Sequence, residues 1–283
     1  MLLDAFEGIE ERAQARARGI ELDFDGVERT QREQTVNHDS QGAGVSVNHR
    51  AVILFQNFML VRHNEFLVEP SYYVQAAEWV AAQADLGEAA SMADVGAGLG
   101  RFLYELLRRA PGIRQAAYVE PSPTLFRWGE RLLSAGREIP YIPYVEGLGR
   151  VEQHEGSRDL GLDAQLLDKI SLINGSADTL SANQQRYDLV SSLNVVDQCA
   201  YPSVFASEAM ELVKSGGYAV FASTYQWQER FYIEAETTFA NLNDLFTDGD
   251  WSLVAEADFD YEFRRGDRHR SRFLSHHVMY RRS

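Results

Sequence analysis

The stretch Met92-Ala-Asp-Val-Gly-Ala-Gly-Leu-Gly-Arg-Phe-Leu-Tyr-Glu-Leu-Leu107 places three glycines within five positions, between an apolar run and an amphipathic one. The apolar run predicts a buried strand over Ser91–Val95, and the amphipathic run predicts a helix over Arg101–Arg109. The glycines therefore form a strand-to-helix turn, where glycine permits unusual backbone angles and lets a ligand touch the main chain. We expect a binding site at this turn.

The glycine spacing separates several kinds of nucleotide-binding loop. A dinucleotide-binding loop has the pattern G-x-G-x-x-G. Here the third glycine comes one residue early, and Arg101 stands where that pattern requires glycine. A P-loop would need Gly-Lys-Ser/Thr, which is not present. A structural turn without a ligand remains an alternative at this point.

Strands alternate with helices from about residue 90 onward, which predicts a parallel sheet with right-handed crossovers. The two last strands flank Arg265-Gly266-Asp267-Arg268 and predict an antiparallel hairpin. Residues 137–168 interrupt the alternation and are interpreted as an insertion. The expected strands are Ser91–Val95, Ala116–Val119, Lys169–Ile173, Asp188–Leu193, Tyr218–Ser223, 251–263 and 271–281. The expected helices are 1–18, 50–61, Ser71 to about Ala84, Arg101–Arg109, Pro123 to about Ala135, 202–213 and 233–246, and residues 30–50 are expected to be irregular.

Composition and charge narrow the function classes. The 283 residues, 45% of them hydrophobic, predict one large domain or one domain with an extra lobe. A net charge of −15 disfavours a bulk nucleic-acid substrate, because such binding depends on Lys and Arg neutralising phosphates. One cysteine, Cys199, excludes an intramolecular disulfide and a Cys-based zinc site. The longest apolar run, Ala51–Val61, is too short to span a bilayer, so we expect a soluble cytoplasmic protein.

Acidic side chains follow the predicted strands at positions suited to a nucleoside. Glu120, followed by Pro121, ends the second strand about twenty residues after the glycines, where a carboxylate can accept hydrogen bonds from both ribose hydroxyls. A surface glutamate is the alternative. Asp178 lies just past the third strand and can accept a hydrogen bond from an adenine amino group, with the backbone of Ala177 completing the contact to the base. Asn194 closes the fourth strand.

These motifs, in this order, resemble those of class I S-adenosylmethionine-dependent methyltransferases over roughly residues 90–281. The resemblance rests on residues 92–100, Glu120, Asp178, the strand 187–194 and the turn Leu212-Val-Lys-Ser-Gly-Gly217. It implies a doubly wound α/β fold with a seven-stranded, mostly parallel sheet whose last strand is antiparallel. It also implies a cofactor site formed by Asp94, Gly96, Ala97, Gly98, Gly100, Glu120, Pro121, Ala177, Asp178 and Asn194. The glycines would border the methionine and ribose parts of S-adenosylmethionine, and Asn194 the sulfonium side.

A narrower resemblance lies toward the C-terminal end. Phe221-Ala-Ser-Thr-Tyr-Gln-Trp227 and the hairpin Asp258–Arg282 are similar to the methyltransferase domain of ovothiol-synthesis enzymes, which methylate an imidazole nitrogen of a thiol-bearing histidine. The first ninety residues do not share this resemblance. We expect residues 1–89 to form a helical lid on the acceptor side and residues 90–283 to form the cofactor-binding domain.

Candidate residues for the acceptor side follow the fourth and fifth strands. Asp197 is a candidate base or anchor for a substrate amine, with helix capping as the alternative. Tyr225, Trp227 and Glu229 can form an aromatic wall with an acid, with ordinary loop packing as the alternative.

Other residue types give weaker indications. Imidazole titrates near neutral pH, so three histidines are candidate bases: His38, His49 and His63. Their spacing in the sequence does not match that of a metal site. Tyr72 and Tyr73 can close over the cofactor or face the core. Cys199 is interpreted as a buried cysteine rather than a nucleophile, and Ser223 and Thr224 stand where a metal-dependent enzyme of the catechol type would have acids, so no metal is expected.

The resemblance implies methyl transfer from S-adenosylmethionine to a nitrogen or oxygen of a small molecule or short peptide. Two alternatives remain: a peptide or protein carboxyl methyltransferase, and a protein of the same fold that binds the nucleoside without transfer. In-line displacement at a sulfonium requires mainly that the nucleophile be held about 3 Å from the methyl group, aligned and out of water.

Overall fold

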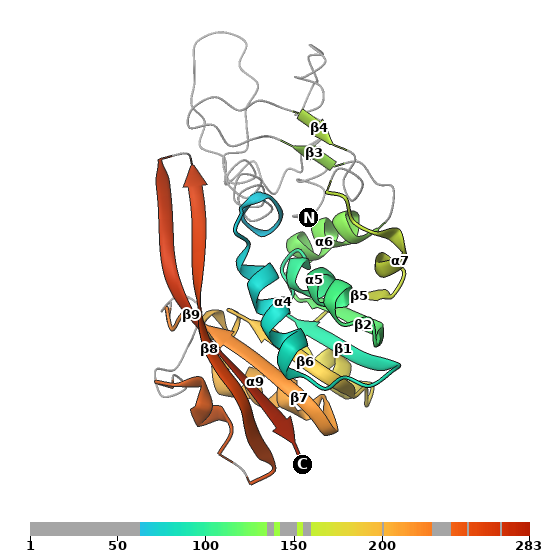
Figure 1. The fold of residues 1–283 in the computed structure, drawn as a ribbon, viewed down its shortest axis with the longest axis vertical. Helices are drawn as coiled ribbons and strands as arrows, with labels where there is room; N and C mark the ends of the chain where they lie inside the picture. The colour runs from blue at the N-terminus through green and yellow to red at the C-terminus, as the bar shows by residue number, and fades with distance from the viewer. Residues whose placement is uncertain are drawn as a thin grey trace, which may run out of the picture.

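The computed structural model describes residues 63–134, 139–141, 152–154, 160–199, 201–227, 239–247, 249–266 and 268–283 (Figure 1). The helices expected over 1–18 and 50–61 and the irregular segment 30–50 lie outside these ranges, as do His38, His49 and Glu229. Among the described helices, none combines the length and apolar character needed to cross a membrane.

Seven strands form one sheet in the order β5-β2-β1-β6-β7-β9-β8. Only β9 runs antiparallel to its neighbours β7 and β8, and the remaining pairs are parallel. The predicted doubly wound, mostly parallel sheet with an antiparallel C-terminal hairpin is therefore confirmed. The strands are β1 (Ala90–Val95), β2 (Ile113–Glu120), β5 (Ile170–Asn174), β6 (Tyr187–Leu193), β7 (Val213–Ser223), β8 (Trp251–Gly266) and β9 (His269–Arg282).

Helices cover both faces of this sheet because its central strands are apolar on both sides. On β1, for example, Met92 belongs to the core cluster on one face, whereas Ala93 and Val95 belong to the cluster on the other. The first face carries α4 (Tyr72–Gln83), α5 (Arg101–Arg109) and α6 (Pro123–Leu133), and the second carries α8 (Ala177–Ala182), α9 (Pro202–Glu211) and the 3-10 turn η4 (Leu242–Leu245).

The strand order reverses between β1 and β6. From β1 the chain moves outward through β2 to β5, and it then crosses back to β6 and β7 on the other side of β1. In open α/β sheets, ligands bind at the carboxyl ends of the strands beside such a reversal. The loop after β1 and the loop after β6 meet at this point.

The structure differs most from the sequence-based prediction in two places, besides an earlier start of β2 at Ile113 and an earlier end of α9 at Glu211. The fifth strand, β7, begins at Val213 rather than Tyr218, because Val213 already pairs with Tyr187 of β6. The prediction of a helix over 233–246 is wrong at Leu242–Leu245, which form the 3-10 turn η4. Residues 233–238 of that expected helix are outside the described part. Asn241 accepts a hydrogen bond from the Asn243 amide at 2.9 Å, and such local bonding competes with an α-helix.

The region 137–168, predicted as an insertion, contains a short antiparallel pair and one helical turn in its described parts. Strands β3 (Ile139–Tyr141) and β4 (Glu152–His154) pair with each other and form a sheet separate from the main one. Helix α7 (Ala164–Leu167) follows and leads into β5.

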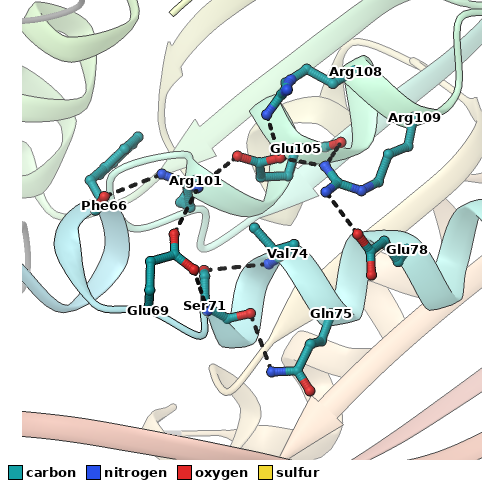
Figure 2. A network of polar contacts seen from close by, with 10 residues as sticks. All are labelled: Phe66, Glu69, Ser71, Val74, Gln75, Glu78, Arg101, Glu105, Arg108 and Arg109. Carbon is teal, nitrogen blue, oxygen red and sulfur yellow. Dashed lines mark hydrogen bonds and ion pairs between the residues drawn. The ribbon is translucent and has the colours of Figure 1, made fainter. Parts of the chain in front are cut away.

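A buried charge cluster joins α5 to the segment before it (Figure 2). Glu105 of α5 is almost fully buried and pairs with Arg101 at 2.7 Å, with Arg108 at 3.2 Å, and with Arg109. Arg109 also reaches Glu78 of α4 at 3.0 Å. Because α5 begins at the glycine turn, this cluster ties α4 to the helix that supports the turn.

The predicted division at residue 89 is not tested by these contacts and stays a prediction. Within the described part, α4 packs against α5 and β8, so this end of the expected lid lies in the helical layer of the sheet. Tyr72 of α4 is buried in that layer.

Candidate active site

The glycine turn joins β1 to α5 in a conformation that only glycine adopts easily. Gly96, Gly98 and Gly100 have φ angles of +74°, +59° and +86°. The Gly96 amide donates to Val119 O at 2.8 Å and holds the turn against β2. A Cβ on Gly96 would lie 2.6 Å from Val195 Cγ2, so the protein's own packing also excludes side chains here.

Two predicted carboxylates meet at this turn. Glu120, at the end of β2, accepts hydrogen bonds from the Gly98 amide at 3.0 Å and the Ser122 amide at 2.9 Å. Asp94, near the end of β1, accepts one from Ser191 Oγ at 2.7 Å. Both side chains are buried, and burial raises the pKa of each to about 7. Neither forms an ion pair within the described residues.

A third buried carboxylate, Glu65, was not predicted from the sequence. It lies in η1 (His63–Leu67), a π-helical turn that precedes α4, and both of its oxygens accept from the Leu99 amide, at 3.2 and 3.1 Å. A Cβ on Gly98 would lie 2.7 Å from Glu65 Oε1. The carboxylate thus contacts the glycine turn directly.

Asn194 lies at the end of β6 with a φ angle of +56°, and its side chain is held from two sides. Its Nδ2 donates to the Tyr72 hydroxyl at 3.0 Å, and its Oδ1 accepts from Ser275 Oγ at 2.8 Å. The Tyr72 hydroxyl is also 2.8 Å from His277 Nε2. Burial lowers the pKa of His277 to about 3, so the imidazole is neutral at ordinary pH.

Residues 93–221 match a family model described as a methyltransferase domain. The match spans a little under half of the chain and agrees with the predicted methyltransferase family. The predicted family implies S-adenosylmethionine as the cofactor.

Several solved structures are similar to the methyltransferase at low identity. A SAM-dependent methyltransferase from Aquifex aeolicus matches over 77% of this chain and 97% of its own, with 12% identity and a TM-score of 0.46. A precorrin-6y C5,15-methyltransferase from Geobacter metallireducens GS-15 matches over 74% and 87%, with 12% identity and a TM-score of 0.45. The precorrin 8w decarboxylase of Methanobacterium thermoautotrophicum matches over 78% and 98%, with 16% identity and a TM-score of 0.45. A comparison with curated proteins gave no match.

The cofactor residues predicted for this methyltransferase lie along the carboxyl edge of the sheet. Ala97 is in the glycine turn, Pro121 follows β2, and Ala177 and Asp178 begin α8 beside the end of β5. Glu120 pairs in register with Asn174 of β5, so the predicted ribose and adenine contacts lie at adjacent strand ends. The buried carboxylates and the left-handed glycine backbone fit a ligand that carries hydroxyl groups and positive charge.

Asp178 has a structural contact that competes with its predicted one. Its Oδ1 accepts from the Thr179 amide at 2.8 Å and from Ser176 Oγ, and these contacts lower the pKa of the carboxyl. The side chain is exposed, and these hydrogen bonds all go to Oδ1 rather than to Oδ2. Its predicted contact with adenine stays a prediction.

Among the residues predicted for the methyl-acceptor side, Asp197 has a carboxylate oxygen that can accept further hydrogen bonds. It is 2% exposed, and its Oδ2 accepts from Ser223 Oγ at 3.1 Å and Thr224 Oγ1 at 3.0 Å. Its Oδ1 makes no hydrogen bond of good geometry in the described part of the chain. Burial raises the pKa of the carboxyl. The side chain therefore does not cap a helix, and it holds the end of β7 instead.

Tyr225 and Trp227 have contacts of the kind expected from loop packing. The Tyr225 hydroxyl contacts His276 Nδ1 and accepts from the Leu242 amide at 2.9 Å, so it connects η4 to the hairpin. The Trp227 ring packs edge to face against the Phe239 ring, with 5.1 Å between the ring centroids. Their predicted role as an aromatic wall stays a prediction. Cys199 is half-buried, and burial raises the pKa of its thiol to about 12.

Proposed function

We propose that this methyltransferase transfers a methyl group from S-adenosylmethionine to a nitrogen or oxygen of a small molecule or short peptide. The observation that carries the proposal is the glycine turn at the strand-order reversal, with its left-handed backbone and the Glu120 carboxylate on the Gly98 amide. An acidic protein with a single cysteine also fits a small acceptor and a reducing compartment such as the cytoplasm.

The cofactor supplies an electrophilic methyl group on sulfur. In the proposal, Glu120 accepts hydrogen bonds from the ribose hydroxyls, since each of its oxygens keeps free lone pairs beside one amide contact. Asn194 forms the wall beside the sulfonium. Its amide group is already held by Tyr72 and Ser275, so it acts as a rigid surface rather than as a free donor.

The acceptor is proposed to lie between the carboxyl edge and the segment before β1. Asp197 can hold an amine or accept a proton there, because Oδ1 is buried without a hydrogen bond of good geometry from the described residues and burial raises the carboxyl pKa. An imidazole nitrogen is the first acceptor to test, because of the similarity of Phe221–Trp227 and the hairpin to ovothiol-synthesis enzymes.

Calorimetry with S-adenosylhomocysteine tests the proposal. The wild-type protein should bind it, and thermal melts should rise with S-adenosylhomocysteine and not with NAD or NADP. Glu120→Gln should weaken binding at least tenfold, since hydrogen bonds to a charged carboxylate contribute about 1.5–3 kcal/mol each. Glu88→Gln, at an exposed position, is the matched control and should bind as wild type does.

A mass-spectrometric screen for products one methyl group heavier then identifies the acceptor class. Methylated carboxylates would favour the carboxyl-methyltransferase alternative. Binding of S-adenosylhomocysteine without any methylated product would favour a nucleoside-binding protein. No binding of S-adenosylhomocysteine, or stabilisation by a nicotinamide cofactor alone, would contradict the proposal.

A further inference from the structure

The turn η1 brings a carboxylate to the glycine turn from outside the segment that matches the family model. Glu65 is 4% exposed, both oxygens accept from the Leu99 amide, and Oε1 lies 2.7 Å from the position of a Cβ on Gly98. The Gly98 amide is at the same time bonded to Glu120. Gly98 therefore lies between two carboxylates, one at its amide and one at its Cα.

Contacts on both sides of Glu65 hold η1 in this place. Asn64 exchanges two hydrogen bonds with the backbone of Arg264 on β8, one of 2.8 Å from its Nδ2 and one of 2.6 Å to its Oδ1. Arg101 donates to Phe66 O at 3.4 Å and lies over the Phe66 ring (Figure 2). The position of Glu65 is thus set by the hairpin and by α5 together.

The charge around Gly98 is unbalanced. Glu65, Asp94 and Glu120 are each at most 4% exposed, and none forms an ion pair with a cationic side chain of the described residues. Burial, with the neighbouring Glu120 and Asp94, raises the pKa of Glu65 to about 8. Burying carboxylates without a counter-charge is costly, so a cation that binds here recovers that cost.

We propose that Glu65 binds the α-ammonium group of the cofactor's amino-acid end. This inference rests on the proposed function, because it places the ribose on Glu120 and the amino-acid end across the glycine turn. Once the ammonium group favours its ionised form, the carboxylate has about four acceptor positions, and the backbone amides of Leu99 and Arg101 occupy only part of this capacity. Glu65 can therefore keep the turn closed and accept from the ammonium group together.

A ligand series tests the assignment. S-adenosylhomocysteine carries the ammonium and carboxylate groups, its decarboxylated analogue keeps only the ammonium group, and 5′-methylthioadenosine lacks both. Their dissociation constants are measured by calorimetry for wild type, Glu65→Gln and the exposed control Glu88→Gln. Glu65→Gln keeps the shape of the side chain and removes its charge. We expect it to weaken the first two ligands at least tenfold and to leave 5′-methylthioadenosine within about twofold.

Each result decides the question. Equal losses for all three ligands would show that Glu65 only shapes the turn, and unchanged or tighter binding of the ammonium ligands would show that it blocks the site; either overturns the proposal. Wild-type protein that binds none of the ligands would contradict the proposed function instead. Far-UV circular dichroism of Glu65→Gln verifies that the variant is folded.

Proton release gives a second readout. The ammonium group should lower the pKa of Glu65, so wild type should release more protons on binding S-adenosylhomocysteine at pH 7 than Glu65→Gln does, measured as the buffer dependence of the binding enthalpy. Equal release would count against the proposal. The other titratable groups that face Glu65 are Asp94, Glu120, Tyr118, Tyr73 and Tyr261, and both proteins share them.

Discussion

Replacing Tyr72 with phenylalanine removes one oxygen from the centre of a buried polar network. The Tyr72 hydroxyl lies 3.0 Å from Asn194 Nδ2, 2.8 Å from His277 Nε2 and 3.0 Å from Ser275 Oγ. The ring of phenylalanine fills the same space, so no cavity larger than the hydroxyl is left. The Asn194 amide and the His277 imidazole each lose a partner, at about 1–3 kcal/mol for each unsatisfied group.

Ser275 offsets part of this loss, because its Oγ is already 3.4 Å from His277 Nε2. We therefore expect Tyr72→Phe to lower the free energy of unfolding by about 2–4 kcal/mol, which corresponds to a fall of roughly 5–15 °C in Tm for a domain of this size. Urea titration followed by circular dichroism measures the first quantity, and a thermal melt measures the second.

The adjacent residue supplies the control. Tyr73 is in the same helix, and its hydroxyl hydrogen-bonds Tyr261, whereas the Tyr72 hydroxyl lies among three polar partners, so Tyr73→Phe should cost less than Tyr72→Phe. If Tyr72→Phe is as stable as wild type, or if the two variants lose the same stability, the hydrogen bonds of the Tyr72 hydroxyl do not stabilise the fold and this reasoning is refuted.

Two further predictions concern ionisable groups of the site. The pKa of Glu65 is raised from 4.5 to about 8 in the folded state, so the unfolded chain loses this proton first and wild-type stability falls as pH rises between these values. The free energy of unfolding of Glu65→Gln should rise by about 1.4 kcal/mol relative to that of wild type for each pH unit in that window. Urea titration without ligand measures it, and a difference that does not change with pH would contradict the prediction. Asp197→Asn should lower turnover with the identified acceptor by about a hundredfold, the low end for a general base, and leave the affinity for S-adenosylhomocysteine unchanged. Full turnover by this variant would exclude Asp197 from either role.

Local patterns in the sequence predicted most of the sheet and the position of the glycine turn between β1 and α5. Helix α5 has the predicted bounds, Arg101–Arg109, because its apolar spacing is regular and Gly100 precedes it in a left-handed conformation. Glu120 was predicted to end the second strand, where its carboxylate could reach a ribose, and β2 does end at Glu120. The structure adds its hydrogen bond from the Gly98 amide, and the ribose contact stays a prediction.

Contacts between distant segments could not be predicted in the same way. Glu65 reaches Leu99 across 34 positions, and Tyr72 reaches His277 across 205. In the sequence, Glu65 is one acid among 42 acidic residues, and no spacing rule distinguishes it. Its burial depends on how η1 docks on the hairpin, which is a property of the folded chain.

Strand β9 follows β8 along the chain but lies between β7 and β8 in the sheet. During synthesis on the ribosome, β7 and β8 are therefore made before β9, the strand that pairs with both of them. Until β9 is made, their edges are unpaired, and unpaired strand edges are prone to wrong pairings. Ser275 and His277 are both on β9, so the side chains that hydrogen-bond Asn194 and Tyr72 are synthesised after the other strands of the sheet. A nascent chain consequently closes its sheet and completes its candidate active site in one and the same step.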